Sequence, residues 1–499
     1  MPGEFLYGSI SFADRIKIMF SINLMFRLLP YIVKLFLFAS ALSLLPFAFG
    51  AKPLNVVFFL IDDLGWNDVG ASGSDYYQTP NIDQLAKGGM RFTNGYAACN
   101  VCSPTRAAIM TGKYPARLLL TQWLPSGRWD AKKNKKQEAR YISNLPLEEF
   151  TIAEALREGG YKTAFMGKWH LGTLPYYFPE HQGFDLNVAG RDYGAPGSYW
   201  YPFEGSWKIP TTPGLKVFKD NPLSGKEGDY LPDRLAEEGD QFIRDNADSP
   251  FFLMMSHYAV HSPLQGKPDK VAKYEKIPKD QSQGDPRYAA MVESVDDSVG
   301  RILKAVRDIG AEDNTLVIFT SDNGGMWKAT SNAPLRANKG SNYEGGLRVP
   351  VIIKWPGVAK PGSVSEVLVT SSDYYPTILA AADQPILPLQ HLDGVDLTPV
   401  LKNQGQVDRD AIFWHYPHYN QHPESFPSGV IRKRDWKLIE KFDTGELELY
   451  DLATDEGEQD NLASKRPRLA QNLLSEMRAW RQEVGADPMR PNTLYEGNN

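Results

Sequence analysis

Two short polar segments follow apolar runs and carry side chains that could bind a metal ion. Asp62 and Asp63 come directly after the run at 55–61, and Asp322 and Asn323 follow a second such run. If both runs are parallel strands, these side chains meet at the edge of the sheet where ligands bind. Three carboxylates there repel one another unless a cation compensates their charge. Oxygen ligands suit Ca²⁺ or Mg²⁺ better than Zn²⁺, although each acid could instead cap a helix.

The chain has two cysteines, Cys99 and Cys102, in a C-x-x-C pattern. Pro104 suits a first helical turn, so Cys102 is expected at or just before a helix N-terminus, where an anionic centre is favoured. Arg106 lies one turn further along the same face. Structural zinc usually requires a second pair of ligands nearby, which the sequence lacks. A C-x-x-C redox pair remains an open alternative.

These segments resemble the formylglycine-dependent (type I) sulfatases. C-S-P-T-R at 102–106, followed by A-A-I-M-T-G-K-Y, has the C-x-P-x-R form of that family's signature. The resemblance runs from about Asn55 to about Leu462. It includes N-V-V-F-F-L-I-D-D-L-G-W at 55–66, G-K-W-H-L-G at 167–172, H-S-P at 261–263, S-D-N-G-G at 321–325 and K-G-S-N-Y-E-G-G-L-R-V-P at 339–350. Arylsulfatase A, N-acetylgalactosamine sulfatases and secreted bacterial carbohydrate sulfatases are the most similar types.

The resemblance implies that a formylglycine-generating maturation enzyme oxidises Cys102 to an aldehyde, which then hydrates. One hydroxyl of the diol attacks sulfur, and the other later expels sulfate and restores the aldehyde. Cys99 has no role in this pattern and is expected to be a small buried residue. The Ca²⁺ ligands that the resemblance implies are Asp62, Asp63, Asp322, Asn323 and the modified Cys102.

The resemblance also implies roles for the basic residues. Arg106 holds the modified side chain near the metal, and Lys168 and Lys339 contact the sulfate group. His170 orients the diol as a base or hydrogen-bond partner. His261 lies near the leaving oxygen and is a candidate general acid. With a divalent cation the set is net positive, which suits an anionic ester, whether sulfate or phosphate; the formylglycine signature favours sulfate.

A ring-dense segment, W-H-Y-P-H-Y at 414–419, is a candidate contact surface for a sugar. His415 and His418 are the substrate candidates in it, although the segment could equally be a strand and core turn of a small domain. Further candidates for the rim of the site are Trp123, Arg128, Arg191 and Tyr193.

The elements that must position these residues alternate along the chain. The continuous apolar run at 55–61 is typical of a strand buried on both faces of a parallel sheet. Thr151 and Glu154 form a capping box that starts a helix, which ends at Gly159. Alternation of strands and helices predicts an α/β fold, a mostly parallel sheet flanked by helices, and the resemblance implies that it is alkaline-phosphatase-like. The other expected strands are 162–166, 251–256, 316–320 and 349–355, and the other helices are 80–88, 103–111 and 285–310.

The pattern changes near residue 405. Short strands are expected at 411–415, 429–432, 436–440 and 447–450, followed by a helix at about 466–483. This predicts a catalytic domain at 51–405 and a smaller C-terminal α+β subdomain with an antiparallel sheet at 406–499. Long loops at 125–149 and 186–230 are expected to shape the site.

The first fifty residues are expected to be a signal peptide. The apolar run at 35–49 follows Arg27 and Lys34, precedes small residues and is too short to span a bilayer. Met25 is a possible true start. The protein is therefore expected to be exported, to the periplasm or outside the cell, with no membrane attachment after cleavage.

The amino-acid composition and net charge exclude several classes of protein. The 499 residues have a formal net charge of −6 and 42% hydrophobic residues, which excludes a disordered, collagenous or polytopic membrane protein. Without a basic excess, a general nucleic-acid binder is also excluded. We expect a sulfuric ester hydrolase acting on sulfated carbohydrates. The alternatives are a phosphodiesterase or phosphonate hydrolase on the same scaffold, a non-catalytic glycan-binding relative, and the redox protein mentioned above.

Overall fold

The structure, a computed structural model, describes residues 52–124, 128–173, 175–204 and 223–496. The predicted signal peptide at 1–50 lies outside the described residues. Residues from Pro53 onward form one compact unit, so the predicted division near residue 405 remains a prediction. Within the described ranges, every helix is too short or too polar to cross a membrane.

An eight-stranded sheet forms the centre of the fold, in the order β10-β2-β9-β8-β1-β7-β5-β6. Only β9 runs against the others, as its antiparallel pairing with both β8 and β2 shows. The mostly parallel sheet predicted from the sequence is therefore confirmed. Its strands are β1 (Asn55–Ile61), β2 (Met90–Phe92), β5 (Lys162–Gly167), β6 (Leu186–Val188), β7 (Phe251–Ser256), β8 (Thr315–Ser321), β9 (Val351–Lys354) and β10 (Ser363–Ser365).

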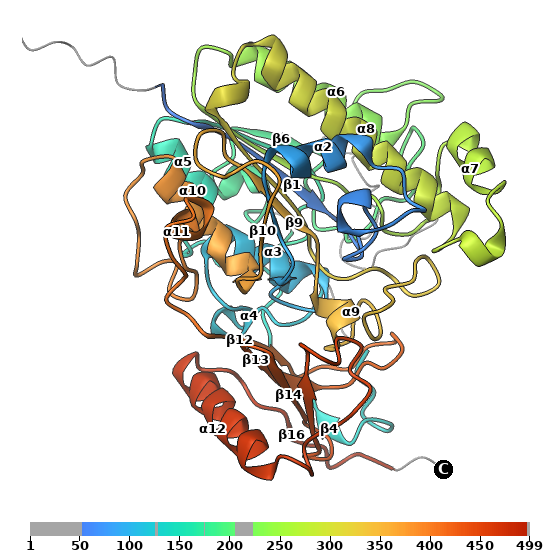
Figure 1. Cartoon of the computed structure of the whole chain (residues 1–499), viewed down its shortest axis with the longest axis vertical. Helices are drawn as coiled ribbons and strands as arrows, with labels where there is room; N and C mark the ends of the chain where they lie inside the picture. The colour runs from blue at the N-terminus through green and yellow to red at the C-terminus, as the bar shows by residue number, and fades with distance from the viewer. Residues whose placement is uncertain (1–51, 125–127, 174, 205–222, 497–499) are drawn as a thin grey trace, which may run out of the picture. The chain divides into compact units, whose positions relative to one another are not determined.

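Strand β1 shows why this sheet needs helices on both sides. Its alternate residues pack into two separate apolar clusters, and all seven are buried. One cluster includes α2 (Pro80–Gly88), α6 (Leu231–Asp245) and α8 (Pro286–Asp308). The other includes α3 (Cys102–Thr111), α5 (Ile152–Glu158) and α10 (Tyr374–Ala381), and Figure 1 shows the two groups on opposite sides of the sheet.

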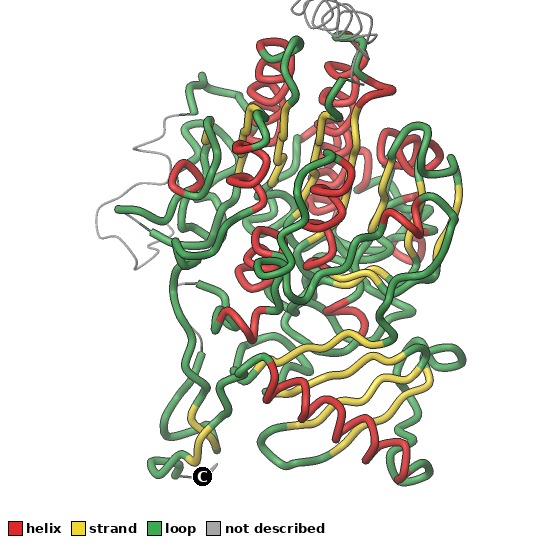
Figure 2. The backbone as a smooth tube through the Cα atoms, turned by 90° about the vertical axis from the view of Figure 1, so that its left-hand side faces the viewer, coloured by secondary structure: helices red, strands yellow, loops and turns green. Residues whose placement is uncertain are grey.

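A second sheet of four antiparallel strands, β12-β13-β14-β15, confirms the α+β pattern expected after residue 405. Helix α12 (Pro467–Glu483) covers one face through contacts such as Met477 with Ile431 and Leu438. The other face, including Trp414 and Val430, packs against Tyr96. Figure 2 shows the helix lying along the four strands, which are β12 (Ala411–Tyr416), β13 (Ser428–Lys433), β14 (Trp436–Lys441) and β15 (Leu447–Asp451).

The predicted capping box at α5 is confirmed, since Thr151 accepts from the Glu154 amide and Glu154 accepts from the Thr151 amide. Several short elements were not predicted, because two to four residues carry little periodicity. Among them are β2, β6 and β10, and also β3 (Gly95–Tyr96), β4 (Lys136–Gln137), β11 (Val369–Thr370), β16 (Arg490–Pro491), α4 (Pro115–Leu118), α9 (Glu344–Leu347) and α11 (Thr398–Leu401). Three longer helices, α6, α10 and α7 (Pro268–Tyr274), were also not predicted.

Candidate active site

Four adjacent parallel strands, β8, β1, β7 and β5, end at the same edge of the central sheet. The register pairs Ile61 with Ser321 across β1 and β8, and pairs Ser256 of β7 with both Leu60 and Gly167. The residues that follow these strands therefore meet, as the sequence analysis expected for the two acidic segments. They include Asp62, Asp63, Lys168, His170, His261, Asp322 and Asn323.

Three buried carboxylates at this edge each contact a cationic side chain. The Lys168 ammonium is 2.7 Å from Asp62, and the Lys339 ammonium is 2.6 Å from Asp63. Asp322 accepts a hydrogen bond from Nε of Arg106 at 2.9 Å and lies 2.7 Å from its Nη2. The aspartates have no solvent-exposed surface, so these contacts supply the charge compensation that burial requires.

Three oxygens in this cluster are buried without a hydrogen-bond partner among the described residues: Oδ1 of Asp62, Oδ2 of Asp63 and Oδ1 of Asn323. Unsatisfied buried oxygens from two carboxylates and an amide match the ligands that a hard divalent cation takes. Ligand atoms of Asp62, Asp63 and His261 also lie within 4.8 Å of one another. Oδ2 of Asp322 accepts from Arg106 at 2.9 Å, whereas its Oδ1 accepts only the longer bond from the Asp63 amide, at 3.3 Å.

The pKa values of the neighbouring Asp62 and Asp63 shift in opposite directions. Burial, helped by Asp322 and Asp63, outweighs Lys168 and raises the pKa of Asp62 well above its usual range. Burial also opposes ionisation of Asp63, but Lys339, His261 and Lys168 outweigh it and lower that pKa. Of the two carboxylates, Asp62 is therefore the one whose ionised form would gain more from a nearby cation.

Cys102 lies in the first turn of α3, as predicted, and is 3% exposed. Its Sγ is 3.3 Å from Nδ1 of His170. The Nε2 atom of His170 faces the carbonyl of Leu124, and a carbonyl only accepts, so Nε2 carries the proton and Nδ1 presents its lone pair to Cys102. Burial and Lys168 lower the pKa of His170 well below its usual value, so the ring is neutral.

Arg106 connects three strand ends. Besides contacting Asp322, it donates to the Lys168 carbonyl and, at 2.8 Å, to Oγ of Ser256. Ser256 in turn donates to the Lys168 carbonyl at 2.7 Å. Ser256 was not predicted as a site residue. A usable signal was that it ends a buried apolar run, as Ile61 does just before Asp62.

His261 stands at the open side of the cluster, with its side chain 16% exposed and Nε2 3.6 Å from Asp63. Its Nδ1 lies 2.8 Å from the Ser262 carbonyl and therefore carries the proton of the neutral ring. Burial and Lys339 lower its pKa to about 3. A general-acid role thus depends on added negative charge, such as that of a bound ester. Tyr199 holds this loop by donating to the His261 carbonyl at 2.8 Å.

Two of these residues, Asp63 and His170, have left-handed backbone conformations, with φ of 63° and 59°. Such conformations cost of order 1–3 kcal/mol for residues other than glycine and cluster at functional sites. They were not predictable from residue type. Gly167, with φ of 107°, precedes Lys168 because a Cβ there would lie 2.1 Å from the Ser256 carbonyl oxygen.

The proposed substrate residues of the ring-dense segment do not join this cluster. His418 has no exposed surface; its ring bonds Thr121 at 2.8 Å and lies 3.6 Å from Glu138. His415 is 7% exposed and bonds the Asp487 carbonyl at 3.0 Å. Both rings are held by contacts outside the cluster, so neither residue is carried into the proposal for the catalytic site.

The rim candidates Arg191, Arg128 and Trp123, and also Cys99, make the following contacts. Arg191 places its carbonyl 2.9 Å from the amide of His170, and Arg128 stacks over Trp123 at 5.8 Å. Cys99 is 4% exposed and packs with Val101, as expected for a small buried residue. Burial raises the pKa of its thiol to about 12, which makes it unreactive.

Comparison with known proteins identifies the family. The sulfatase family model matches residues 54–384, and the model of the N-sulphoglucosamine sulphohydrolase C-terminal region matches residues 337–483. The chain belongs to the sulfatase family. A sulfatase of Formosa agariphila is 33% identical over 86% of this chain and 88% of its own length. Human arylsulfatase A is 36% identical over 74% of this chain and 71% of its own. The chain is therefore a sulfatase, an enzyme that hydrolyses sulfate esters.

Solved structures of sulfatases share the fold. Ps i-CgsB bound to k-i-k-neocarrahexaose has a TM-score of 0.72 and 30% identity, covering 89% of this chain and 95% of that one. The alkaline-phosphatase-like fold expected from the resemblance is thus confirmed. A phosphonate monoester hydrolase of Agrobacterium radiobacter, with a TM-score of 0.60 and 22% identity over 86% of this chain and 96% of that one, shares the fold as well. The fold by itself does not separate sulfate from phosphonate chemistry.

Proposed function

We propose that this sulfatase removes sulfate groups from carbohydrates with a formylglycine made from Cys102 and a bound Ca²⁺. The observation that carries the proposal is the position of Cys102, at a helix N-terminus and 3.3 Å from the His170 lone pair, beside three buried carboxylates. When formed and hydrated, formylglycine supplies one hydroxyl that attacks sulfur and a second whose loss of a proton releases sulfate. Bound Ca²⁺ supplies a positive charge that polarises the ester.

The chain's own residues position and protonate the reacting groups. His170, with Nε2 fixed as the donor, accepts a proton through Nδ1 from the group at position 102. Arg106 holds that group near the strand ends through its bonds to Asp322 and Ser256. His261 takes up a proton from solvent once an anionic ester binds and donates it to the leaving oxygen as the ester bond breaks.

In this proposal, Lys168 and Lys339 bind the sulfate group of the substrate. In the structure their ammonium groups pair with Asp62 and Asp63. Asp62, Asp63, Asp322 and Asn323 would hold a divalent cation, whose charge would compensate these carboxylates. Lys168 and Lys339 are then available to a sulfate group, where fixed cations stabilise the charge that develops on its oxygens.

The proposed substrate class rests on the relatives. Mouse N-acetylgalactosamine-6-sulfatase is 32% identical over 76% of this chain and 72% of its own length, and Ps i-CgsB was crystallised with a hexaose. Both point to carbohydrate sulfates. We further propose export, directed by the signal peptide at 1–50, and modification of Cys102 by a maturation enzyme.

Sulfate esters are expected to be hydrolysed faster than phosphate or phosphonate esters with the same leaving group. The measurement is kcat/KM for matched aryl sulfate, phosphate monoester, phosphate diester and phosphonate, followed by a panel of sulfated mono- and disaccharides. A higher kcat/KM for any phosphorus ester would favour the phosphodiesterase alternative. Binding of sulfated saccharides with no turnover of any ester would favour the glycan-binding alternative.

Gly194→Ala is expected to lower kcat/KM about 10²-fold, because misplacement of a catalytic group by about 1 Å costs that much. A Cβ at Gly194 would lie 2.8 Å from Cε1 of His170, so the ring must shift from its position beside Cys102. Steady-state kinetics with an aryl sulfate checks this. Gly405→Ala is the matched control, since its Cβ would meet only Pro399 at 3.9 Å. Equal activity of the two variants would show that the position of His170 does not matter.

A further inference from the structure

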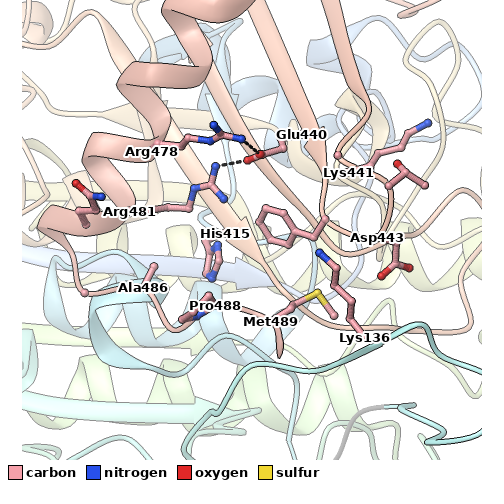
Figure 3. A pocket seen from close by; sticks show the side chains of 15 residues that line it. Lys136, His415, Glu440, Lys441, Asp443, Arg478, Arg481, Ala486, Pro488 and Met489 are labelled. Atoms are coloured by element: carbon pink, nitrogen blue, oxygen red, sulfur yellow. Dashed lines mark hydrogen bonds and ion pairs between the residues drawn. The ribbon is translucent and has the colours of Figure 1, made fainter. Parts of the chain in front are cut away.

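A pocket of about 840 Å³, separate from the catalytic cluster, lies in the C-terminal part of the chain. Its wall comes from β4, β12, β14, the turn after β14, and α12 with the segment that follows it (Figure 3). Ala411 of β12 packs toward α12 whereas Trp414 faces the catalytic part, so alternation along the strand places His415 on the α12 side. The proposed catalytic and metal-binding residues are absent from the lining among the described residues.

His415 lines this wall and carries a buried acceptor atom without a partner among the described residues. The side chain is only 7% exposed, and its Nε2 lies 3.0 Å from the Asp487 carbonyl. Because a carbonyl only accepts, Nε2 carries the proton. Burial lowers the pKa of His415 to about 4, so Nδ1 is an unprotonated acceptor at neutral pH. In the part of the chain that the structure describes, Nδ1 has no partner.

Cationic donors lie in the same wall. Arg481 and Arg478 both bind Glu440, as Figure 3 shows, yet the Nε of Arg481 is buried and has no partner among the described residues. Lys136 forms no ion pair within the described ranges. Phe442 adds an aromatic face that stacks beside the Arg481 guanidinium at 5.2 Å.

These groups select a ligand by chemistry. The Nδ1 acceptor requires a hydroxyl or amide donor, the Arg481 and Lys136 donors require anionic oxygen, and the Phe442 ring suits an apolar C–H face. Inorganic sulfate lacks the hydroxyl, and a neutral sugar lacks the charge. A saccharide that carries a sulfate group offers all three, and the volume is in the usual range for such ligands.

We propose that this pocket is a second, non-catalytic binding site for a sulfated saccharide unit, with its anionic group at Lys136 and Arg481 and a hydroxyl on His415. The inference rests on the proposed carbohydrate substrate. A site of this kind binds one part of a polysaccharide while another part reaches the catalytic edge, which raises the effective substrate concentration.

The test measures binding directly, by calorimetry of the full chain with a sulfated disaccharide. Cys102→Ala and Lys339→Ala together provide a background in which the catalytic cluster neither turns over nor holds the ligand. In that background, Lys136→Ala is expected to weaken binding about tenfold, as loss of a charged hydrogen bond does. Lys135→Ala, the adjacent lysine outside the pocket, is the matched control and is expected to change affinity less than twofold.

His415→Phe keeps an aromatic ring but removes the Nδ1 acceptor and also the Nε2 bond to the Asp487 carbonyl. It provides a second variant, and its melting temperature is measured to exclude unfolding. It is expected to weaken binding about fivefold. Equal losses in Lys136→Ala and Lys135→Ala, equal binding of the unsulfated disaccharide, or no binding in the double-variant background would each overturn the proposal. Sulfatase activity of the wild type is measured separately, so failure of the proposed substrate class and failure of this site are distinguishable.

Discussion

Replacement of Cys102 by alanine is expected to abolish sulfate-ester turnover, with a fall in kcat on the order of 10⁴–10⁶, as for other enzymes that lose their nucleophile. The reason is that the thiol is the precursor of the proposed diol and no other cysteine lies near His170 among the described residues. Activity toward an aryl sulfate and mass spectrometry of the peptide containing Cys102, after co-expression with a maturation enzyme, check the prediction together.

Cys99→Ala is the matched control. Cys99 is buried and its thiol bonds only the adjacent residues Asn100 and Val101 among the contacts described, so its loss is expected to leave turnover within about threefold and to cost about 1 kcal/mol of stability. Equal damage from the two substitutions would favour the C-x-x-C redox alternative. Full turnover by protein with an unmodified thiol at position 102 would refute the formylglycine mechanism.

Removal of divalent cations is expected to reduce turnover to background and to lower the melting temperature, and Ca²⁺ is expected to restore both. Asp62, Asp63 and Asn323 hold buried oxygens without partners, which a cation would satisfy. A ligand at 100 times its Kd stabilises the folded state by about 2.7 kcal/mol. Calorimetric melting with and without Ca²⁺, after chelation and metal analysis, measures the effect independently of activity.

Asp62→Asn is expected to lose most of the Ca²⁺-induced rise in melting temperature. Asp68→Asn is the control, because Asp68 is also fully buried after β1 but bonds Tyr288 and Thr330 instead of facing the cluster. Its own stability falls, yet its response to Ca²⁺ should remain. Full activity of exhaustively chelated wild type, or the same Ca²⁺ response in both variants, would contradict a metal at this edge.

Much of the scaffold could be predicted from the sequence because the determining patterns are local. The apolar run at 55–61 fixed a doubly buried strand, and Thr151 with Glu154 fixed a helix start, since both depend on neighbouring residues. The acidic segments after two such runs also predicted where Asp62 and Asp322 meet, because parallel strands end at a common edge.

Only the tertiary structure decided the protonation states and hydrogen-bond partners of the site residues. Which ring nitrogen of His170 carries the proton depends on the Leu124 carbonyl, and the bracing of Arg106 depends on Ser256, both remote in sequence. The structure also separated His415 from the catalytic edge and placed it in another pocket. Residue types and spacing determine which chemistry is available, whereas burial, tautomers and long-range contacts arise only when distant segments pack together, because desolvation and hydrogen bonding act through space and not along the chain.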